Sequence, residues 1–280
     1  MQQEYHKIKL ESDDLEWLYV PDVKYAEYES CKRYIQLFIP YRRQWKEDRK
    51  YPLVLFIPGA AWYRQEMYNS IPSYSKLAER GFVTAVVQHR ESTIARYPAQ
   101  IHDINNAIQF LLQKADKFHI DKEKIYISGN SSGGHIALMS ALTKANGIIN
   151  GGYDIKGIIA LSAPTDILLC ATEKIPEFMP KEFRPTKDLL GVDDVLENKE
   201  LARQASCATY ISKDINIPKV LLIHGTLDSQ VSIEHSRQLY NQLKEADKNV
   251  IFYEIEGSDH GGVEFWSEEI LDIIDSFIER

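Results

Sequence analysis

Short apolar or alternating runs recur along the chain, and patterns of helical spacing separate most of them. Runs of this kind predict β-strands, whereas apolar positions three and four residues apart predict helices. The predicted strands lie at residues 23–29, 33–40, 53–57, 82–88, 125–128, 157–161, 220–223 and 250–255. The predicted helices lie at about residues 72–80, 98–116, 132–146, 232–247 and 263–279.

The order of these elements predicts the fold class. From residue 53 onward strands and helices alternate, which is typical of a mostly parallel sheet with helices on both faces. The first two runs have no helix between them and therefore predict an antiparallel hairpin at one edge. We expect an α/β protein with about eight strands. The 280 residues, of which 44% are hydrophobic, suit a single domain over residues 1–280.

Residues 164–213 interrupt this alternation. The segment is too long for a plain connection and contains short helical pieces such as residues 193–204. Its prolines are Pro164, Pro176, Pro180 and Pro185. Long insertions in compact folds often serve as lids or binding loops, so we expect a small lid-like insertion here. A surface excursion without a function is the alternative.

Charge and cysteine content narrow the class of protein. The net charge of −8 argues against nucleic acid or an anionic membrane as the main partner. The three widely separated cysteines, Cys31, Cys170 and Cys207, suggest neither a disulfide framework nor a zinc site. Residues 1–17 lack the apolar stretch of a signal peptide, and no apolar run is long enough to span a membrane. We expect a cytoplasmic protein without a bound metal.

The junction at residues 125–142 carries the candidate nucleophile. A β-branched run meets Gly129, Ser131 and Gly133 in a Gly-x-Ser-x-Gly pattern, and a helical pattern follows at once. Such a sharp turn holds its serine in a strained conformation with the hydroxyl exposed, and small neighbours allow the close approach. The motif alone is weak, because a glycine-rich loop would look the same. Its placement between a strand and a helix predicts that Ser131 is a nucleophile.

Two later segments offer the partners that a nucleophilic serine needs. Its hydroxyl requires a base, and the base requires an orienting carboxylate. Asp228 and His260 each follow a predicted strand, and the carboxyl ends of parallel strands meet at one edge of a sheet. We therefore expect a Ser131–His260–Asp228 triad. Asp259 is the rival acid, and capping of the next helix is the alternative role for Asp228. The other histidines are weaker candidates for the base: His6, His89, His102, His119, His135, His224 and His235.

The loop after the strand at residues 53–57 is the candidate oxyanion loop. Acyl transfer needs backbone N–H groups that face the developing oxyanion, and small residues bring such groups close to the substrate. The predicted donors are the amides of Ala60, Ala61 and Ser132. The predicted substrate contacts are Gly59, Trp62 and Tyr63. A mere tight turn, and core packing for Trp62, are the alternatives.

Together these motifs resemble the esterase branch of the α/β-hydrolase superfamily. The likeness is greatest to the acetyl-esterase and hormone-sensitive-lipase-like enzymes and to the feruloyl-esterase-like group. LVLFIPGAAW resembles that family's strand and HGGGW or HGGAW loop, and GNSSGG its GDSAGG elbow. TAVVQHR with Tyr97, Pro98 and Asp103, LLIHGTLDSQV, and EGSDHGG are similar to further family segments. The resemblance runs from about Leu53 to the C-terminus and implies the α/β-hydrolase fold.

Three positions depart from the family pattern. Pro58 stands in place of the oxyanion histidine, Ala60 in place of the second glycine, and Asn130 in place of the usual aspartate. An alanine amide can still donate, but a loop that needs a positive φ would be strained by alanine. The family's N-terminal cap is not recognisable, so residues 164–213 are the candidate lid.

The resemblance implies a serine carboxylesterase that hydrolyses short or modest acyl esters, of acetyl or aryl-acyl type, through an acyl-enzyme. It implies a small-molecule ester as the partner and no cofactor. An amide hydrolase of arylformamidase type is one alternative. A non-catalytic ligand receptor on the same scaffold is another, although such proteins typically lack the serine or the histidine. Family members often pair, which makes a homodimer a further expectation.

Overall fold

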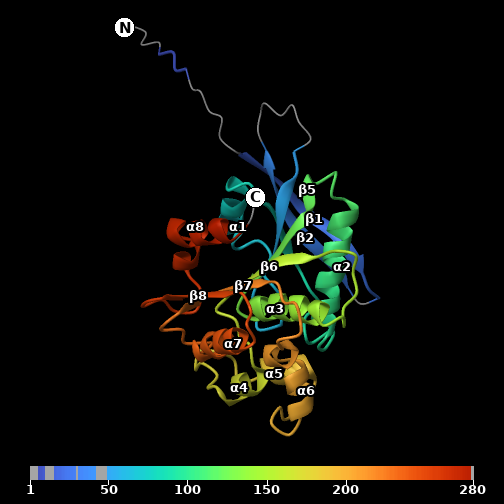
Figure 1. Cartoon of the computed structure of the whole chain (residues 1–280), viewed down its shortest axis with the longest axis vertical. Helices are drawn as coiled ribbons and strands as arrows, with labels where there is room; N and C mark the ends of the chain where they lie inside the picture. Colours follow the sequence, from blue (N-terminus) through green and yellow to red (C-terminus); the bar gives the residue numbers. More distant parts are fainter. Residues whose placement is uncertain (1–5, 10–15, 30, 42–48, 279–280) are drawn as a thin grey trace.

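One eight-stranded sheet forms the centre of the molecule (Figure 1). The computed structural model describes residues 6–9, 16–29, 31–41 and 49–278, and within these the strands follow the order β1-β2-β4-β3-β5-β6-β7-β8. The strands are β1 (Glu16–Glu27), β2 (Lys32–Tyr41), β3 (Tyr51–Ile57), β4 (Val83–Val87), β5 (Ile120–Asn130), β6 (Ile155–Leu161), β7 (Lys219–Gly225) and β8 (Val250–Ile255). The predicted α/β class and strand number are confirmed.

The sheet is mixed at one edge and parallel elsewhere, as predicted. β1 pairs antiparallel with β2, and β2 antiparallel with β4, while every other neighbouring pair is parallel. The prediction placed the start of β1 seven residues too late, at residue 23 instead of Glu16. A register shift between Val20 and Val23, with a positive φ of 52° at Asp22, breaks the two-residue period there.

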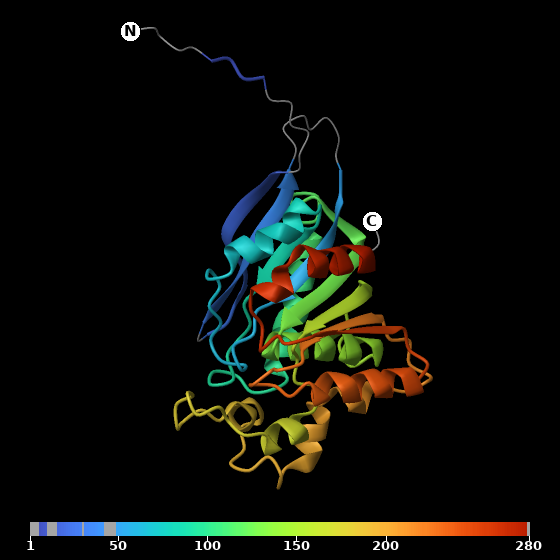
Figure 2. The ribbon, with the colours of Figure 1, turned by 90° about the vertical axis from the view of Figure 1, so that its left-hand side faces the viewer.

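Five longer helices cover the two faces of the sheet. They are α1 (Ile71–Glu79), α2 (Ala99–Gln113), α3 (Ser132–Ala145), α7 (Glu234–Glu245) and α8 (Glu268–Phe277). Side chains of α1 and α8 share one apolar cluster, and those of α2, α3 and α7 share the other. Figure 2 shows α1 and α8 side by side over one face.

The last predicted helix, residues 263–279, is divided in the structure. A short 3₁₀ turn, η2 (Val263–Trp266), precedes α8, and residue 279 lies outside the described residues. The division falls at Ser267, whose hydroxyl accepts the Ile270 N–H and caps α8. The pattern of apolar residues alone does not reveal this local cap.

The insertion, residues 164–213, gathers at one end of the molecule (Figures 1 and 2). It contains α4 (Ile167–Thr172), α5 (Pro185–Leu190), α6 (Lys199–Gln204) and the 3₁₀ turn η1 (Cys207–Tyr210). The predicted helix at residues 193–204 is shorter, because the Asp194 carboxylate accepts the N–H groups of Leu196 and Glu197 and closes a turn instead. Buried insertion residues such as Leu189 and Ala202 belong to the main core, so the segment is firmly packed.

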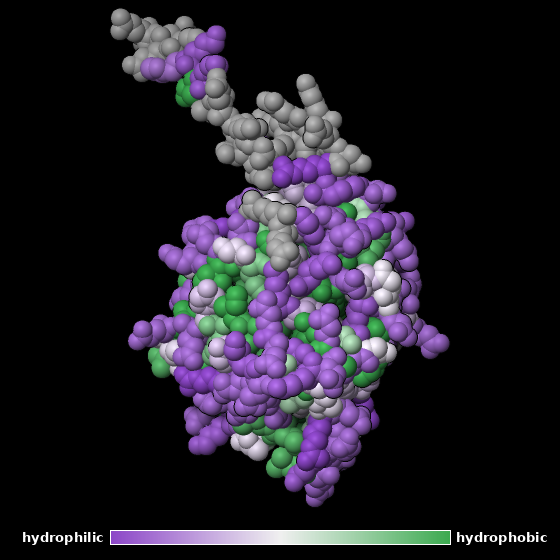
Figure 3. Space-filling view, in the orientation of Figure 1, coloured by the Kyte–Doolittle hydropathy of each residue, from purple (hydrophilic) through white to green (hydrophobic). Residues whose placement is uncertain are grey.

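Hydrophilic side chains cover most of the face seen in Figure 3, and hydrophobic ones form separate patches. No helix within the described part of the chain is long and apolar enough to cross a membrane. Three strongly exposed hydrophobic residues are Phe178 in the insertion, Leu227 beside Asp228, and Val263 shortly after His260. Apolar exposure therefore occurs on the loops that hold the candidate acid and base.

Candidate active site

Ser131 occupies the sharp turn between β5 and α3. It has a φ of 52° and a ψ of −132°, a conformation that residues with a Cβ seldom adopt. The two elbow glycines permit the turn, because a Cβ on Gly133 would lie 1.9 Å from the Ile57 carbonyl oxygen and one on Gly129 would lie 2.5 Å from Gly133. The Ser131 amide donates to the Leu161 carbonyl at 2.8 Å, which fixes the turn against β6.

The three predicted triad side chains lie together at the carboxyl edge of the sheet. His260 Nε2 lies 2.9 Å from Ser131 Oγ, and His260 Nδ1 lies 2.8 Å from Asp228 Oδ2. The carboxylate assigns the proton to Nδ1, which leaves Nε2 free to accept from the serine hydroxyl. This arrangement can remove a proton from Ser131 and hold the resulting imidazolium in place.

Asp228 is fully buried and receives hydrogen bonds on both oxygens. The amides of Gln230 and Val231 donate to Oδ1 at 2.9 and 2.8 Å, and His224 Nε2 lies 3.1 Å from Oδ2. Burial raises the Asp228 pKa, but the hydrogen bonds from His224 and His260 outweigh burial and hold the pKa well below its usual range. The carboxylate is therefore ionised wherever His260 acts as a base.

His224 is a contributor that the sequence predicted only as a weaker candidate for the base. Its Nδ1 lies 2.7 Å from Ser236 Oγ, so the serine hydroxyl can donate to it. Its Nε2–H is shared between the Val231 carbonyl at 3.0 Å and Asp228 Oδ2 at 3.1 Å. The available signal was a histidine at the end of an otherwise apolar strand, four residues before the acid. A buried polar side chain at such a position needs partners, and the acid is within reach.

Asp259 faces away from the imidazole. Its Oδ1 accepts the amide hydrogens of Ser229 at 2.8 Å and of His260 at 2.7 Å. The carboxylate thus binds backbone amides and not the imidazole of His260. The geometry therefore favours Asp228 over this rival as the partner of His260.

The oxyanion loop lies against the elbow through two side chains. The Gly59 amide donates to Asn130 Oδ1 at 3.0 Å, and the Ala60 amide donates to Ser132 Oγ at 3.0 Å. The amides of Ala61 and Ser132 have no acceptor among the described residues. These two amides, unlike that of Ala60, are therefore unoccupied donors among the described residues.

Gln65 is a second contributor that sequence reasoning missed. Its Nε2 donates to the carbonyls of Pro58 at 3.0 Å and Val87 at 3.2 Å, and its Oε1 accepts the His89 amide at 2.8 Å. The side chain thus ties the start of the oxyanion loop to the end of β4. A single glutamine in a loop carries no sequence signal for this role.

Two cavities meet at Ser131 and His260. The first, of about 330 Å³, is called the oxyanion-side cavity. Its lining includes Gly59, Ala60, Ala61, Trp62, Ser132 and, from the insertion, Cys170, Met179 and Phe183. The second, of about 310 Å³, is called the α1-side cavity. Its lining includes Phe56, Ser70, Tyr74, Ser162 and Trp266. An ester bound at Ser131 can therefore extend in two directions.

The predicted substrate contacts take different places. Gly59 and Trp62 line the oxyanion-side cavity, and the Trp62 side chain is also buried in the core. Of the two cavities at Ser131, Tyr63 lines neither within the described residues. Its hydroxyl instead donates to Asp188 Oδ2 at 2.6 Å, and its ring lies against Phe183. Tyr63 thus attaches the loop to the insertion.

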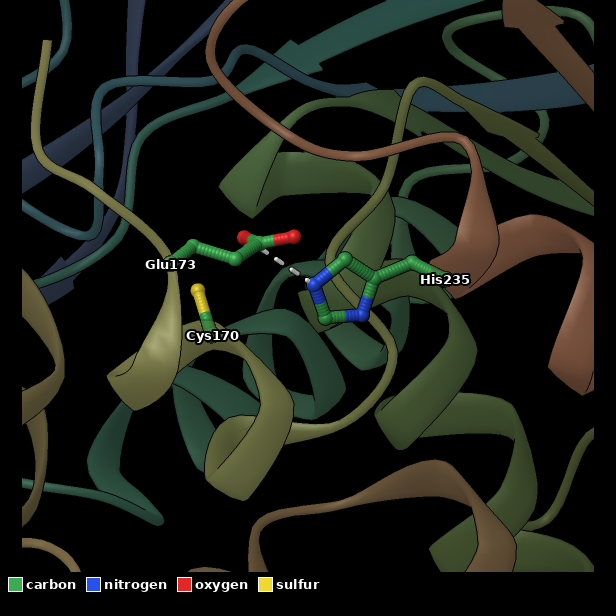
Figure 4. A group of neighbouring side chains, drawn as sticks. All are labelled: Cys170, Glu173 and His235. Atoms are coloured by element: carbon green, nitrogen blue, oxygen red, sulfur yellow. Dashed lines mark hydrogen bonds and ion pairs between the residues drawn. The ribbon is translucent and has the colours of Figure 1, made fainter.

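Cys170, Glu173 and His235 form a group that has the residue types of a metal site (Figure 4). Their potential ligand atoms lie within 4.8 Å of one another. However, His235 Nδ1 accepts the amides of Thr165 and Asp166, so Nε2 carries the proton and donates to Glu173. Burial also raises the pKa of the Cys170 thiol to about 12. His235 Nε2 is protonated and the Cys170 thiol is not ionised, whereas metal ligands must be deprotonated. The group therefore fits a hydrogen-bonded contact between α4 and α7 better than a metal centre.

Known proteins similar to this chain carry esterase names. The BD-FAE family profile matches residues 39–243. The chain belongs to the BD-FAE family. Esterase LipC of Mycobacterium tuberculosis is 28% identical over 240 residues, which cover 81% of this chain and 57% of LipC. The chain spans about half the length of the curated relatives that it matches.

Solved structures confirm the α/β-hydrolase fold of this BD-FAE member. A truncated carbohydrate esterase from gut microbiota has a TM-score of 0.79 and 24% identity, with 95% of this chain and 96% of that one covered. Esterase B of Lactobacillus rhamnosis has a TM-score of 0.75 and 18% identity, with 95% and 85% covered. Each likeness covers 95% of this chain.

Proposed function

We propose that this protein is a serine carboxylesterase that hydrolyses short or modest acyl esters through an acyl-enzyme. The observation that carries the proposal is the chain of contacts from Ser131 Oγ to His260 Nε2 at 2.9 Å and from His260 Nδ1 to Asp228 at 2.8 Å. The esterase names of the relatives and structural neighbours support ester chemistry.

In the proposed reaction Ser131 Oγ attacks the ester carbonyl while its proton passes to His260 Nε2. The amides of Ala61 and Ser132 then donate to the oxyanion. The Ala60 amide can add a third bond only if the Ser132 hydroxyl, its acceptor at 3.0 Å, moves aside. His260 returns the proton to the leaving alcohol, and the same residue activates a water that hydrolyses the acyl-enzyme.

Cavity size supports substrates of modest size. Cavities of about 330 and 310 Å³ extend from Ser131 in two directions, one for each arm of an ester. Met179 and Phe183 bring apolar surface from the insertion to the first, which fits a lid function for residues 164–213. Acetyl and aryl-acyl esters fit these dimensions. A homodimer and a cytoplasmic location remain predictions from the sequence.

The decisive experiment labels the purified protein with a fluorophosphonate and locates the adduct by mass spectrometry. We expect modification of Ser131, and hydrolysis of p-nitrophenyl acetate should fall by at least about 1000-fold in Ser131→Ala. Labelling at another serine, or an active Ser131→Ala variant, would contradict the triad. A wild-type protein that neither reacts with the probe nor hydrolyses any ester would favour the receptor alternative.

A substrate panel separates ester from amide chemistry. Rates with acetate, butyrate, octanoate and feruloyl esters should exceed the rate with N-formylkynurenine. Acetate or feruloyl esters should give the highest kcat/KM, because each cavity holds a small or flat group. Faster hydrolysis of N-formylkynurenine would replace the ester proposal with the amide one.

A further inference from the structure

The oxyanion loop adopts backbone angles that its residues disfavour. Ala61 has a φ of 49° and Trp62 a φ of 61°, both in the left-handed region. A residue with a Cβ avoids this region because the Cβ approaches the following carbonyl oxygen. Two such residues in succession persist only if their surroundings hold them. The Ala61 amide is one of the two donors proposed for the oxyanion, so whatever holds the loop also aims this donor.

The Trp62 side chain and carbonyl are both fixed by hydrogen bonds. Its buried indole Nε1–H donates to His135 Nδ1 at 3.0 Å, and the two rings meet edge to face. Its carbonyl accepts the Ser92 amide at 2.9 Å. An indole has one N–H and no acceptor, so this contact uses the whole polar capacity of the side chain. Trp62 is thereby attached to α3, the helix that Ser131 precedes.

His135 connects Trp62 to the insertion by a second hydrogen bond. Because Nδ1 accepts from Trp62, Nε2 carries the proton and donates to the Ala205 carbonyl at 2.8 Å, just after α6. The imidazole is completely buried, and burial lowers its pKa to about 4. A neutral imidazole has one donor and one acceptor, and both are used here. The direction of the hydrogen bonds from Trp62 through His135 to Ala205 is therefore fixed.

The next residue of the loop is also bound to the insertion. The Tyr63 hydroxyl donates to Asp188 on α5 at 2.6 Å, and its ring contacts Phe183. The Tyr63 amide donates to the Ala60 carbonyl at 2.8 Å, closing the turn around Ala61. Two successive residues after Ala61 thus depend on the insertion through separate contacts.

We propose that the insertion holds the oxyanion loop in its catalytic conformation through the Trp62–His135–Ala205 hydrogen bonds. Trp62 and His135 are then positioning residues for the hydrolysis proposed above, on which this inference rests. Without these bonds Ala61 relaxes toward a negative φ, and its amide turns away from the oxyanion. The loss falls mainly on the transition state, because Ser131 and His260 stay in place, as does the α1-side cavity, whose lining contains no residue of the loop.

Two substitutions remove the contact from opposite ends. His135→Phe keeps a ring and loses both hydrogen bonds, whereas Trp62→Phe loses the donor and leaves His135 bound to Ala205. With p-nitrophenyl acetate we expect kcat to fall by about 10- to 100-fold in each variant, which does not exceed the fall caused by removing one oxyanion donor. The KM should stay within about threefold of the wild-type value. If His135→Phe does not fold, Trp62→Phe decides the matter.

A rescue distinguishes positioning from general damage. Glycine at position 61 tolerates a positive φ, so Ala61→Gly should restore part of the activity lost in His135→Phe. A double-mutant cycle compares kcat in the wild type, His135→Phe, Ala61→Gly and the double variant. We expect the double variant to be at least about fivefold more active than the product of the two single effects. Tyr153→Phe is the control, since it removes one partly buried hydrogen bond, to Asn105 at 2.7 Å, on residues that line neither cavity at Ser131. This control should keep the wild-type kcat.

Three outcomes distinguish failure of this inference from failure of the esterase proposal. Folded His135→Phe and Trp62→Phe proteins with kcat within about twofold of wild type would overturn the inference and leave the esterase proposal intact. A fall in kcat without rescue by Ala61→Gly would also overturn it, because the loss would not arise from the backbone of the loop. A wild-type protein that is inactive and unlabelled at Ser131 would remove the esterase proposal and this inference together.

Discussion

The nucleophile elbow and the oxyanion loop meet at Ser131, but they hold their unusual backbone angles by different means. In the elbow only Ser131 has a disfavoured positive φ, and the glycines on either side leave room for it. In the loop Ala61 and Trp62 are both left-handed, with no glycine at either position. The elbow therefore combines glycines next to Ser131 with contacts to the neighbouring strands β3 and β6. The loop has no such glycines and depends on Asn130, Gln65, His135 and the insertion.

This difference explains how the loop can depart from the familiar glycine-rich pattern and still leave the amides of Ala61 and Ser132 without an acceptor among the described residues. Tertiary hydrogen bonds can stabilise a conformation that the local sequence disfavours, provided that the bonding groups are buried and fully paired. Such a loop is more sensitive than the elbow to changes at distant residues.

The largest effect is expected in the elbow. A Cβ on Gly133 would lie 1.9 Å from the Ile57 carbonyl oxygen, so Gly133→Ala must displace the backbone that holds Ser131. We expect the free energy of unfolding to fall by more than about 3 kcal/mol and hydrolysis of p-nitrophenyl acetate to fall by at least about 100-fold. Gly152→Ala, where nothing lies within 4 Å, is the control and should be neutral. A stable, active Gly133→Ala protein would contradict the close approach.

Acid should destabilise the fold through two buried histidines that neighbour the oxyanion loop and Gln65. Burial lowers the pKa of His135 and of His89 to about 4, against about 6.5 in an unfolded chain. Between these values only the unfolded state binds the protons, so stability is lost as the pH falls from about 6.5 to about 4. Each histidine contributes about 3 kcal/mol to the loss. Urea titrations over this pH range should show a smaller loss in the free energy of unfolding for His135→Phe than for the wild type. An equal dependence on pH in the two proteins would refute the contribution of His135.

The contact between the two regions should have an intermediate effect. Asn130→Ala removes the acceptor of the Gly59 amide, which lies 3.0 Å from Oδ1. We expect kcat to fall about tenfold, since the loop loses one of its ties to the elbow. Asn130→Asp keeps an acceptor and should recover most of the rate. Equal losses in the two variants would point to a cause other than this hydrogen bond.

The smallest effect concerns the strain of the loop itself. Ala61→Gly relieves the left-handed strain of alanine but increases the entropy of the unfolded chain, and the first effect is the larger. We expect the protein to gain about 0.5 kcal/mol of stability, measured by urea unfolding. A loss of stability of similar size would mean that Ala61 is not strained, and the contrast between the loop and the elbow would be refuted.

Much of the site could be predicted from the sequence because its motifs are local. Ser131 and its glycines, and the positions of Asp228 and His260 after apolar strands, follow from short patterns and from the topology that alternating elements impose. The structure brings these three side chains together as expected. His224 and Gln65 could not be assigned their contacts in this way, because their partners are known only once loops from different strands lie side by side.

Periodicity and residues close along the chain are enough to predict the α/β order of elements, the elbow, and the candidate acid and base. Only the packing of distant segments shows which loop amides already have an acceptor, that Tyr63 binds Asp188, and that the insertion reaches the loop through His135. Such contacts join residues up to 125 positions apart. A hydrogen bond needs two groups at one place and angle, and only the packed chain provides both.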